Sequence, residues 1–556
     1  MAVAAALPFL PALGNTWVNW DDPIYLLENP WYRGFGLENL RWMFTAQLSS
    51  HYQPMVWLTY ALDYTLWGMN PLGYHLTTIL LHSLNAALVF FLAARLLNGG
   101  PAAAAFAALV FAVHPLRVES VVWAAQRRDV LCGTFTLAAV LAYLRGQESG
   151  KWRAASVGLY CLALLSKAIA LTLPASLLVL QWFPLRRLTG ASWRSCAPKV
   201  LRGLVPFALA AGAMSMIALG GEARGRSLWS WEQHGLWARL AQCGYGLCFY
   251  LAKTLLPVGL SPIYELPFQL DPRSFPFPLT AAGVLGITAL CWRIREKRPE
   301  WAAAWLIYAI TASPVLGLTQ SGPQIAADRY TYLPCLPWAL LAGAGLGRAL
   351  ESGRRAAAGA VLLVLALAAL TARQTLRWRD SETLWTHAAA VQPRSSIARN
   401  NLGTALIGRG AVAAAAVRFE EALAINPICV QAQRRLAEYA RSGGDPGEIE
   451  PWRLRYDTNP TCRSARANLV TALASQSRFE PALDYYRELL ILEPGNAHAH
   501  NNFGLALAGI GCPETARRSF QEALRLAPND TRARANLNRL PPRERREAEP
   551  SRCRLR

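Results

Sequence analysis

The sequence predicts an all-α protein in two parts: a polytopic bundle of membrane-spanning helices, followed by a solenoid of helical hairpins. Three observations predict this fold class. Of the 556 residues, 53% are hydrophobic and only 16% are charged, an apolar skew for a soluble chain. Almost all of this skew lies before residue 373, where long apolar stretches follow one another. Beyond that residue, prolines recur at a regular spacing.

The membrane part is inferred from apolar stretches near the ~17–25 residues that a bilayer requires. The candidates are 76–97, 101–121, 129–145, 153–183, 203–219, 236–256, 277–292, 301–318, 331–348 and 356–372. The stretch 153–183 contains Lys167 and Pro174, and it could be one tilted helix or two short ones. The run from Ala2 to Leu13 is too short to span a membrane. We therefore expect either that the assigned start codon lies downstream of the true one or that the first helix is truncated, and we favour the first explanation. The full chain would then have about 10 to 12 spans.

Basic loops predict the orientation of these spans. The loops 145–153, 184–202, 293–298 and 348–355 are strongly basic, which assigns them to the cytoplasm. Everything after Arg373 is then extracytoplasmic, and the long loop 15–73 also lies outside if the first span starts inside. Counts from the two ends disagree by one crossing between residues 203 and 256, where we expect a re-entrant or interfacial segment.

The net charge of +21 would suit a nucleic-acid partner, but its distribution argues against one. The basic residues are mostly arginines, dispersed between apolar runs or along the C-terminal helices, and membrane topology and solubility explain them better. The 11 cysteines include no CxxC pair and no zinc-site spacing, so we expect neither a disulfide framework nor a structural metal.

The solenoid part is predicted from Pro393, Pro427, Pro460, Pro494 and Pro528, which lie about 34 residues apart. This is the period of tetratricopeptide repeats, in which such a proline ends the second helix of each hairpin. The pattern NLG at 401–403 returns as NFG at 502–504, and the small residues would let two helices approach closely.

These patterns divide the chain into three regions. We place the membrane domain at 1–373, the repeat domain at 374–540 and a basic, disordered tail at 541–556. The repeat at 428–460 is degenerate, because a Gly-Gly-Asp-Pro run interrupts it.

An acidic pair, Asp21 and Asp22, follows the first apolar run. One carboxylate just beyond a membrane helix could take a proton from an acceptor hydroxyl while the other positions it. His51, in the same loop, could assist with a proton or a phosphate. The alternative is structural, since Asp22 before Pro23 can start a turn and Asp21 can cap a helix.

A second polar set joins two expected spans and consists of His114, Glu119, Arg127 and Arg128. Arginines beside a membrane can clamp a phosphate with two hydrogen bonds each. The alternative is that these side chains only extend from the helix ends to the membrane surface.

Lys167 stands inside an apolar run, where an ionisable group is costly and by default functional. Its expected partner is an anionic lipid phosphate or a carboxylate such as Asp21 or Asp22. Alternatively, it marks a loop between two short helices.

A last set, Asp328, Arg329 and Tyr330, lies at the outer end of a span. Arg329 could contact a donor phosphate while Asp328 orients it, or the tyrosines could simply anchor the helix at the interface. The predicted topology gathers these groups on one membrane face, except that Lys167 could be buried, and this arrangement suits a lipid-phosphate substrate. Because no Gly-rich phosphate loop is evident, a lipid-linked donor fits better than a nucleotide sugar.

Several motifs together resemble the transmembrane and tetratricopeptide-repeat O-mannosyltransferases and their bacterial relatives. They are NWDDP at 19–23, HYQP at 51–54, WGMNPLGYH at 67–75, HSLN at 82–85, HPLRVES at 114–120, QRRDVL at 126–131, LSK at 165–167 and ADRYTYLP at 327–334. The resemblance covers nearly the whole chain, although Gln126 stands where we expect an acidic residue.

The resemblance implies a membrane glycosyltransferase fold of the GT-C type, in which Asp21 and Asp22 match the carboxylates that activate the acceptor. It implies transfer of mannose from dolichyl phosphate, or from a shorter polyprenyl phosphate in a bacterial inner membrane, to serine or threonine of a protein. Arg127, Arg128, Lys167 and Arg329 would stabilise the departing phosphate, and the repeats would hold the acceptor. No cofactor is expected, and a divalent metal is left open.

Two other functions stay open. A non-catalytic membrane scaffold would need neither the buried lysine nor the polar cluster. A glycosyltransferase acting on surface polysaccharide would share the lipid donor, although a repeat domain favours a protein acceptor.

Overall fold

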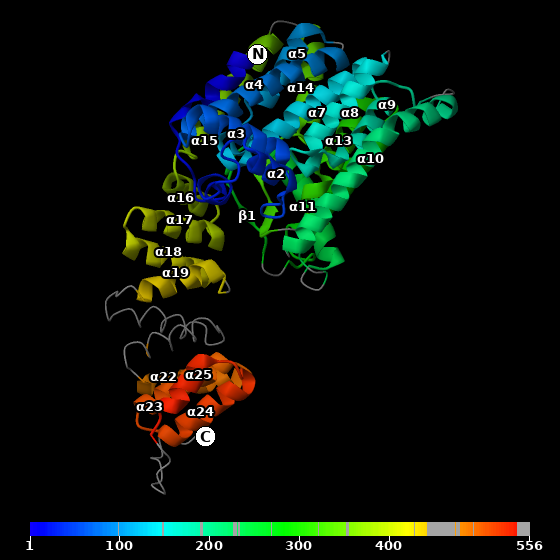
Figure 1. Cartoon of the computed structure of the whole chain (residues 1–556). Helices are drawn as coiled ribbons and strands as arrows, with labels where there is room; N and C mark the ends of the chain where they lie inside the picture. Colours follow the sequence, from blue (N-terminus) through cyan, green and yellow to red (C-terminus); the bar gives the residue numbers. More distant parts are fainter. Residues whose placement is uncertain are drawn as a thin grey trace. The chain divides into compact units, whose positions relative to one another are not determined.

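The computed structural model describes residues 1–441, 473 and 479–541, apart from 98, 147–148, 190–192, 226–228, 230, 232–233, 268–269, 321, 352–354, 428 and 493. It contains two compact units, Met1–Asn401 and Leu402–Arg556 (Figure 1). Nearly all of the described elements are helices, which confirms the all-α fold class.

The first unit is a bundle of helices joined by short turns. Its helices are α1 (Ala2–Ala6), α2 (Leu37–Thr45), α3 (Pro54–Trp67), α4 (Pro71–Leu96), α5 (Gly100–Ala112), α6 (Val118–Val122), α7 (Arg127–Arg145), α8 (Gly150–Leu164), α9 (Leu173–Trp182), α10 (Trp193–Gly225), α11 (Leu236–Leu255), α12 (Phe277–Ile294), α13 (Pro299–Ala312), α14 (Leu336–Glu351), α15 (Arg355–Leu376) and α16 (Ser381–Val391). The turns are η1 (Leu7–Gly14), η2 (Pro23–Leu27), η3 (Pro115–Arg117), η4 (Ala124–Gln126), η5 (Ala168–Thr172), η7 (Ser313–Val315) and η8 (Asp328–Thr331).

Four helices in the described part are long and apolar enough to cross a membrane: α4, the Trp193–Gly221 part of α10, α12 and α15. A fifth span is present if α5 and Pro115–Val122, which meet at a bend of 53°, are counted together. These helices indicate an integral membrane protein. They coincide with the predicted stretches 76–97, 203–219, 277–292 and 356–372.

The remaining predicted stretches fall on helices that are shorter or more polar. Counting the described helices by length and apolar composition therefore gives fewer spans than the predicted 10 to 12. Helix α7 carries three charged residues in its first turn, and α13 ends at Ala312. The stretch 153–183 is two short helices, α8 and α9, which is one of the two alternatives left open above. Lys167 lies at the break between them.

Small residues bring the helices of the bundle together. Ala103 and Ala107 of α5 are fully buried, and α14 places Gly343 against them. A Cβ atom on Gly343 would lie 2.7 Å from the Ala103 carbonyl oxygen and from the Ala107 Cβ, so only glycine permits this close approach. Close packing through small residues is the usual way in which membrane helices associate.

Two short strands form the only described sheet. Strand β1 (Tyr264–Glu265) pairs antiparallel with β2 (Gln324–Ala326), directly before the turn η8. This pairing fixes the start of the segment that carries Asp328 and Arg329.

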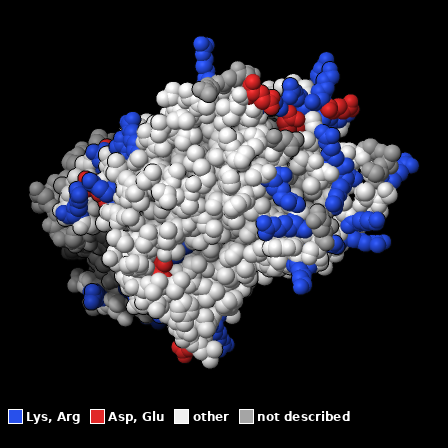
Figure 2. Space-filling view, turned by 90° about the horizontal axis from the view of Figure 1, so that it is seen from above, with Lys and Arg blue, Asp and Glu red and all other residues white. Residues whose placement is uncertain are grey.

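The surface of the bundle fits a membrane environment. Figure 2 shows a broad area almost without charged side chains, with Lys and Arg side chains gathered mainly along one side of the same face. A surface in contact with lipid excludes charge, because ionised groups are costly in hydrocarbon.

The second unit contains the expected helical hairpins. Its helices are α17 (Ser396–Gly408), of which the part from Leu402 onward belongs to this unit, α18 (Val412–Ile425), α19 (Val430–Arg441), α22 (Phe479–Leu492), α23 (Ala497–Gly509), α24 (Pro513–Leu526) and α25 (Thr531–Arg539). Pro427, Pro494 and Pro528 each lie just beyond the end of a helix, as predicted. The interruption of the degenerate repeat at 443–446 and all but the first residue of the tail 541–556 lie outside the described residues.

Two glycines in the repeats have equivalent roles. A Cβ atom on Gly403 would lie 2.7 Å from the ring of Phe419, and one on Gly504 would lie 2.7 Å from the ring of Phe520. Each glycine therefore lets a buried phenylalanine of the following helix pack against its own helix. The close approach predicted from the NLG and NFG patterns is confirmed.

The structure describes both free and bonded cysteines. Cys132, Cys291 and Cys335 are buried and free. Cys512 is disulfide-bonded, a bridge that the sequence analysis did not foresee, although one bonded cysteine does not amount to a disulfide framework.

Candidate active site

Asp22 is held in place by two backbone donors. Its Oδ2 accepts a hydrogen bond from the Val18 N–H at 2.9 Å, and its Oδ1 accepts one from the Ala125 N–H at 3.0 Å. The side chain is 1% exposed, and this burial raises the pKa of Asp22 to about 7, although the two N–H donors favour the ionised form. Both oxygens are engaged, so Asp22 fixes the loop 18–22 against the segment before α7.

Asp21 has a different environment. Within the described part of the chain, its carboxylate accepts no hydrogen bond, and it lies in the field of Arg128 and Arg329. Burial raises the pKa of Asp21, and the two arginines oppose this rise. A carboxylate with open oxygens, a raised pKa and cations nearby has the properties of a general base.

Arg329 forms an ion pair with Glu119. Its Nη1 lies 2.5 Å from Glu119 Oε1, and its backbone N–H donates to Glu119 Oε2 at 2.7 Å. The guanidinium also lies over the rings of Tyr330 and Trp123, with its carbon 4.9 and 5.6 Å from their centroids. These contacts give the planar cation one orientation.

Lys167 pairs with Asp129, which the sequence interpretation did not name as its partner. The ammonium group contacts Asp129 Oδ1 and lies 5.8 Å from the centroid of the Tyr330 ring. The expectation of a carboxylate partner therefore holds, but the carboxylate is Asp129 and not Asp21 or Asp22, which the sequence suggested. Asp129 is next to Arg128 at the start of α7, and this position faces the break between α8 and α9.

Gln126 connects Asp129, the partner of Lys167, to Arg128. Its Nε2 donates to Asp129 Oδ2 at 2.7 Å, and its Oε1 accepts a hydrogen bond from Arg128 Nε at 3.1 Å. Among the described residues, no carboxylate lies within 4 Å of the Arg128 guanidinium, which lies over the Tyr25 ring at 5.8 Å. Arg128 is thus the cation of the cluster that has no carboxylate partner among the described residues. A neutral amide at position 126 supplies both a donor and an acceptor, which a carboxylate there would not do.

His51 completes the set from the first loop. Burial lowers the pKa of His51 well below its usual value, and the charges of Arg128, Lys167 and Arg329 lower it further. The imidazole is therefore neutral near pH 7 and can accept or donate one proton without adding charge.

The structure thus brings together Asp21, His51, Arg128, Lys167 and Arg329, with Glu119 and Asp129 as the acids that pair with two of the cations. Tyr330 lies among them and contacts Lys167 and Arg329 through its ring. We call these eight residues the cationic cluster. Among the described residues, no group of three or more His, Cys, Asp or Glu side chains is arranged to hold a metal ion.

Three other predicted residues lie in different surroundings. Arg127 is fully buried in an ion pair with Asp63, and its Nη2 donates to the Tyr74 carbonyl oxygen at 2.7 Å. His114 uses both ring nitrogens, with Nδ1 accepting from the Leu116 N–H at 3.2 Å and Nε2 bonded to the Thr254 carbonyl oxygen at 3.0 Å.

Asp328 accepts a hydrogen bond from the Tyr264 hydroxyl at 3.0 Å. Burial, helped by the charge of Glu119, raises the pKa of Asp328 well above its usual value. Arg127, His114 and Asp328 therefore support the framework around the cationic cluster, and we do not assign them contacts with a substrate.

Sequence reasoning missed the distant residues that hold the loop with Asp21 and Asp22 in place. Asn19 donates its backbone N–H to Ser381 Oγ at 2.9 Å, and its Oδ1 accepts from the Trp385 indole at 2.6 Å. The partners lie more than 360 residues away in the chain, so no local pattern could pair them. The available signal was the NWDDP motif itself, in which Asn19 precedes the acidic pair.

Comparison with known proteins places the chain among distant relatives. No protein-family model matches it. It is 24% identical over 455 residues to protein O-mannosyl-transferase F38B6.6 of Caenorhabditis elegans, covering 76% of this chain and 61% of that protein. It is 25% identical over 505 residues to protein O-mannosyl-transferase TMTC1 of Homo sapiens, covering 79% and 56%. The resemblance to the O-mannosyltransferase family is confirmed.

The similarity is higher over a shorter region. The chain is 34% identical to human protein O-mannosyl-transferase TMTC4 over 143 residues, which are 22% of this chain and 19% of that protein. The chain spans between 53% and 61% of the length of three relatives that match it over two thirds or more of its residues. Among solved structures, the APC/C hetero-tetramer Cut9-Hcn1 aligns with a TM-score of only 0.25, too low to relate the two folds.

Proposed function

We propose that this protein is a membrane glycosyltransferase that moves mannose from a polyprenyl phosphate to serine or threonine hydroxyls of proteins. The observation that carries the proposal is the position of Asp21, whose carboxylate is free of hydrogen bonds in the described part of the chain and faces two arginines. An acid and several cations at one site suit a reaction that removes a proton at one atom and releases a phosphate at another. The names of the relatives support the same reaction.

The reaction would be a single displacement with inversion at the sugar. The acceptor oxygen attacks the anomeric carbon and forms the new glycosidic bond, while Asp21 takes the hydroxyl proton. The bond between the anomeric carbon and the phosphate oxygen breaks, and the electron pair leaves with the polyprenyl phosphate. Arg128, Arg329 and Lys167 stabilise the charge that develops on this leaving group.

The paired cations have a specific use in this scheme. Lys167 and Arg329 are already neutralised by Asp129 and Glu119, so the empty site does not hold three uncompensated charges in a buried place. Arg128 has no carboxylate partner among the described residues, and guanidinium groups bind phosphate with two parallel hydrogen bonds. The binding of a phosphate then needs no rearrangement of the two existing ion pairs.

The repeats would hold the acceptor protein in their concave groove, on the extracytoplasmic side of the membrane. The proposal places the protein in a bacterial inner membrane.

The test is transfer of radiolabelled mannose from polyprenyl phosphate mannose to protein, with Asp21→Asn compared with Glu28→Gln. Glu28 is an exposed acid in the same loop, so its replacement controls for the loss of one negative charge. We expect Asp21→Asn to lower the rate by roughly 10²–10⁴-fold and Glu28→Gln to leave it unchanged. Equal rates for both variants at equal expression would show that Asp21 is not the base. Labelling from a nucleotide sugar but not from the lipid would contradict the proposed donor.

A further inference from the structure

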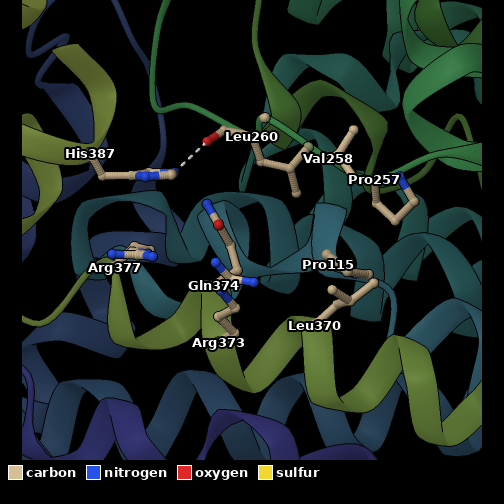
Figure 3. A pocket seen from close by; sticks show the side chains of 10 residues that line it. Pro115, Pro257, Val258, Leu260, Leu370, Arg373, Gln374, Arg377 and His387 are labelled. Atoms are coloured by element: carbon tan, nitrogen blue, oxygen red, sulfur yellow. Dashed lines mark hydrogen bonds between the residues drawn. The ribbon is translucent and has the colours of Figure 1, made fainter. Parts of the chain in front are cut away.

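A cavity of about 220 Å³ lies beside the C-terminal end of α15, and none of its lining residues belongs to the cationic cluster. Figure 3 shows that its lining has two halves. One half is polar and consists of Arg373 and Gln374 of α15, Arg377 just beyond the end of that helix, and His387 of α16. The other half is apolar and consists of Leu370, Pro115 and the loop 257–260.

Arg373 lies in the last turn of α15, and Arg377 lies one residue beyond the end of the helix, where its backbone N–H donates to the Gln374 carbonyl oxygen at 3.0 Å. Among the described residues, neither guanidinium has a carboxylate within 4 Å. His387 Nε2 is hydrogen-bonded to the Leu260 carbonyl oxygen at 3.1 Å. Burial lowers the pKa of His387, and the charges of Arg377 and Arg373 contribute to this lowering. The polar half is thus a site of uncompensated positive charge.

The apolar half is held rigidly. Lys253 Nζ donates to the Val258 carbonyl oxygen at 2.5 Å and to the Gly259 carbonyl oxygen at 3.3 Å. With the bond from His387 to Leu260, three successive carbonyls of the loop have donors. The polar backbone atoms of this wall are therefore satisfied, and a ligand meets mainly its apolar side chains.

Two exposed apolar residues adjoin this wall in the chain. Leu255 and Leu256 are 78% and 64% exposed and directly precede the loop. The α15 helix, which contains Arg373 and ends one residue before Arg377, is one of the candidate membrane spans. An apolar path that joins a membrane-spanning helix to a cationic pocket matches a ligand with a hydrocarbon chain and an anionic head.

We propose that this cavity binds the phosphate group of an anionic lipid, at a site separate from the cationic cluster. The phosphate accepts hydrogen bonds from Arg373 and Arg377, with Gln374 and His387 beside it. The first part of the lipid chain lies against Leu370, Pro115 and the loop 257–260. This inference does not depend on the proposed transfer reaction.

The test uses the full chain in detergent, titrated with phosphatidic acid, with phosphatidylcholine and with inorganic phosphate, with binding measured by native mass spectrometry. The variant Arg373→Gln/Arg377→Gln is compared with Arg355→Gln, which removes an exposed arginine at the other end of α15. We expect phosphatidic acid to bind the double variant about tenfold more weakly or worse, and Arg355→Gln to bind it normally.

Three results would overturn the proposal. They are equal binding by the double variant and the control, an equal loss in both, or inorganic phosphate that binds as tightly as the lipid. The variant Arg373→Lys/Arg377→Lys keeps both charges. It replaces the glutamine variant in the test if the glutamine variant does not fold. Retained lipid binding by the lysine variant would support a cationic site, and its loss in a folded protein would exclude one based on charge.

Discussion

The indole N–H of Trp385 donates a hydrogen bond of 2.6 Å to Asn19 Oδ1, two residues before the candidate base Asp21. Asn19 also donates its side-chain N–H to the Asn401 carbonyl oxygen at 2.9 Å. Trp385 lies on α16, the helix that follows the last candidate span. The position of the acidic loop is thus set by a helix beyond the membrane part, so a change in that helix can alter the site.

Trp385→Phe removes this donor and keeps most of the buried ring. We expect a loss of about 1 kcal/mol of stability and a larger proportional fall in transfer rate, because Asn19 no longer fixes the loop. Thermal unfolding and the mannose-transfer assay measure the two effects. Trp237→Phe, at an exposed tryptophan of α11, is the control and should change neither. An unchanged transfer rate in Trp385→Phe would argue against this coupling.

Asp22→Asn should act on stability, in contrast to Asp21→Asn. One amide NH₂ would face a backbone N–H of Val18 or Ala125 in place of an acceptor oxygen, so we expect a loss of about 1–3 kcal/mol. Asp21→Asn breaks no described hydrogen bond, so its free energy of unfolding should lie within about 0.5 kcal/mol of that of the parent protein. Denaturation in detergent compares the two variants, and the opposite order would reverse the roles assigned to them.

The ion pair of Arg127 with Asp63 should be structural. Arg127→Met leaves a buried carboxylate unpaired, and we expect a loss of about 3–5 kcal/mol. The double variant Arg127→Met/Asp63→Leu should recover most of this stability and also transfer mannose. If the double variant folds but is inactive, Arg127 belongs to the donor site, as the sequence alone suggested.

The transfer rate should fall on acidification through the titration of Asp21. Asp21 acts in its ionised form, and burial raises its pKa, so activity is lost at a higher pH than an ordinary aspartate would give. His51 stays neutral because its pKa is lowered, so His51→Gln should keep the same acidic limb. The pH profile of kcat/KM measures this. A limb that persists in Asp21→Asn would point to Asp22, whose pKa burial raises to about 7.

Gly504→Ala should destabilise the repeats. Its Cβ would lie 2.7 Å from the Phe520 ring, so the helices must separate, at a cost of about 1–3 kcal/mol. Gly408→Ala is the matched control, because a Cβ there meets no atom within 4 Å. Thermal unfolding of the full chain, followed by circular dichroism, should show a lower transition only for Gly504→Ala. Equal transitions would mean that the hairpin can open without cost.

Local patterns in the sequence were sufficient for the fold class and for the repeats. Apolar stretches and prolines act within about 30 residues, so the helices of the bundle and the hairpins around Gly403 and Gly504 could be predicted. The candidate residues were also found, because ionisable side chains in an apolar chain are costly and few. The span count was less certain, since breaks such as the one at Lys167 depend on which side chains lie opposite.

Only the tertiary structure decided how these residues are paired. Lys167 meets Asp129 instead of Asp21, Arg127 meets Asp63, and Gln126 joins Asp129 to Arg128. Such contacts depend on the distances between buried atoms of different helices, and a linear pattern contains no such distances. The division of the acidic pair into a fixed Asp22 and an open Asp21 has the same origin, because the Ala125 N–H that binds Asp22 lies 103 residues away in the chain.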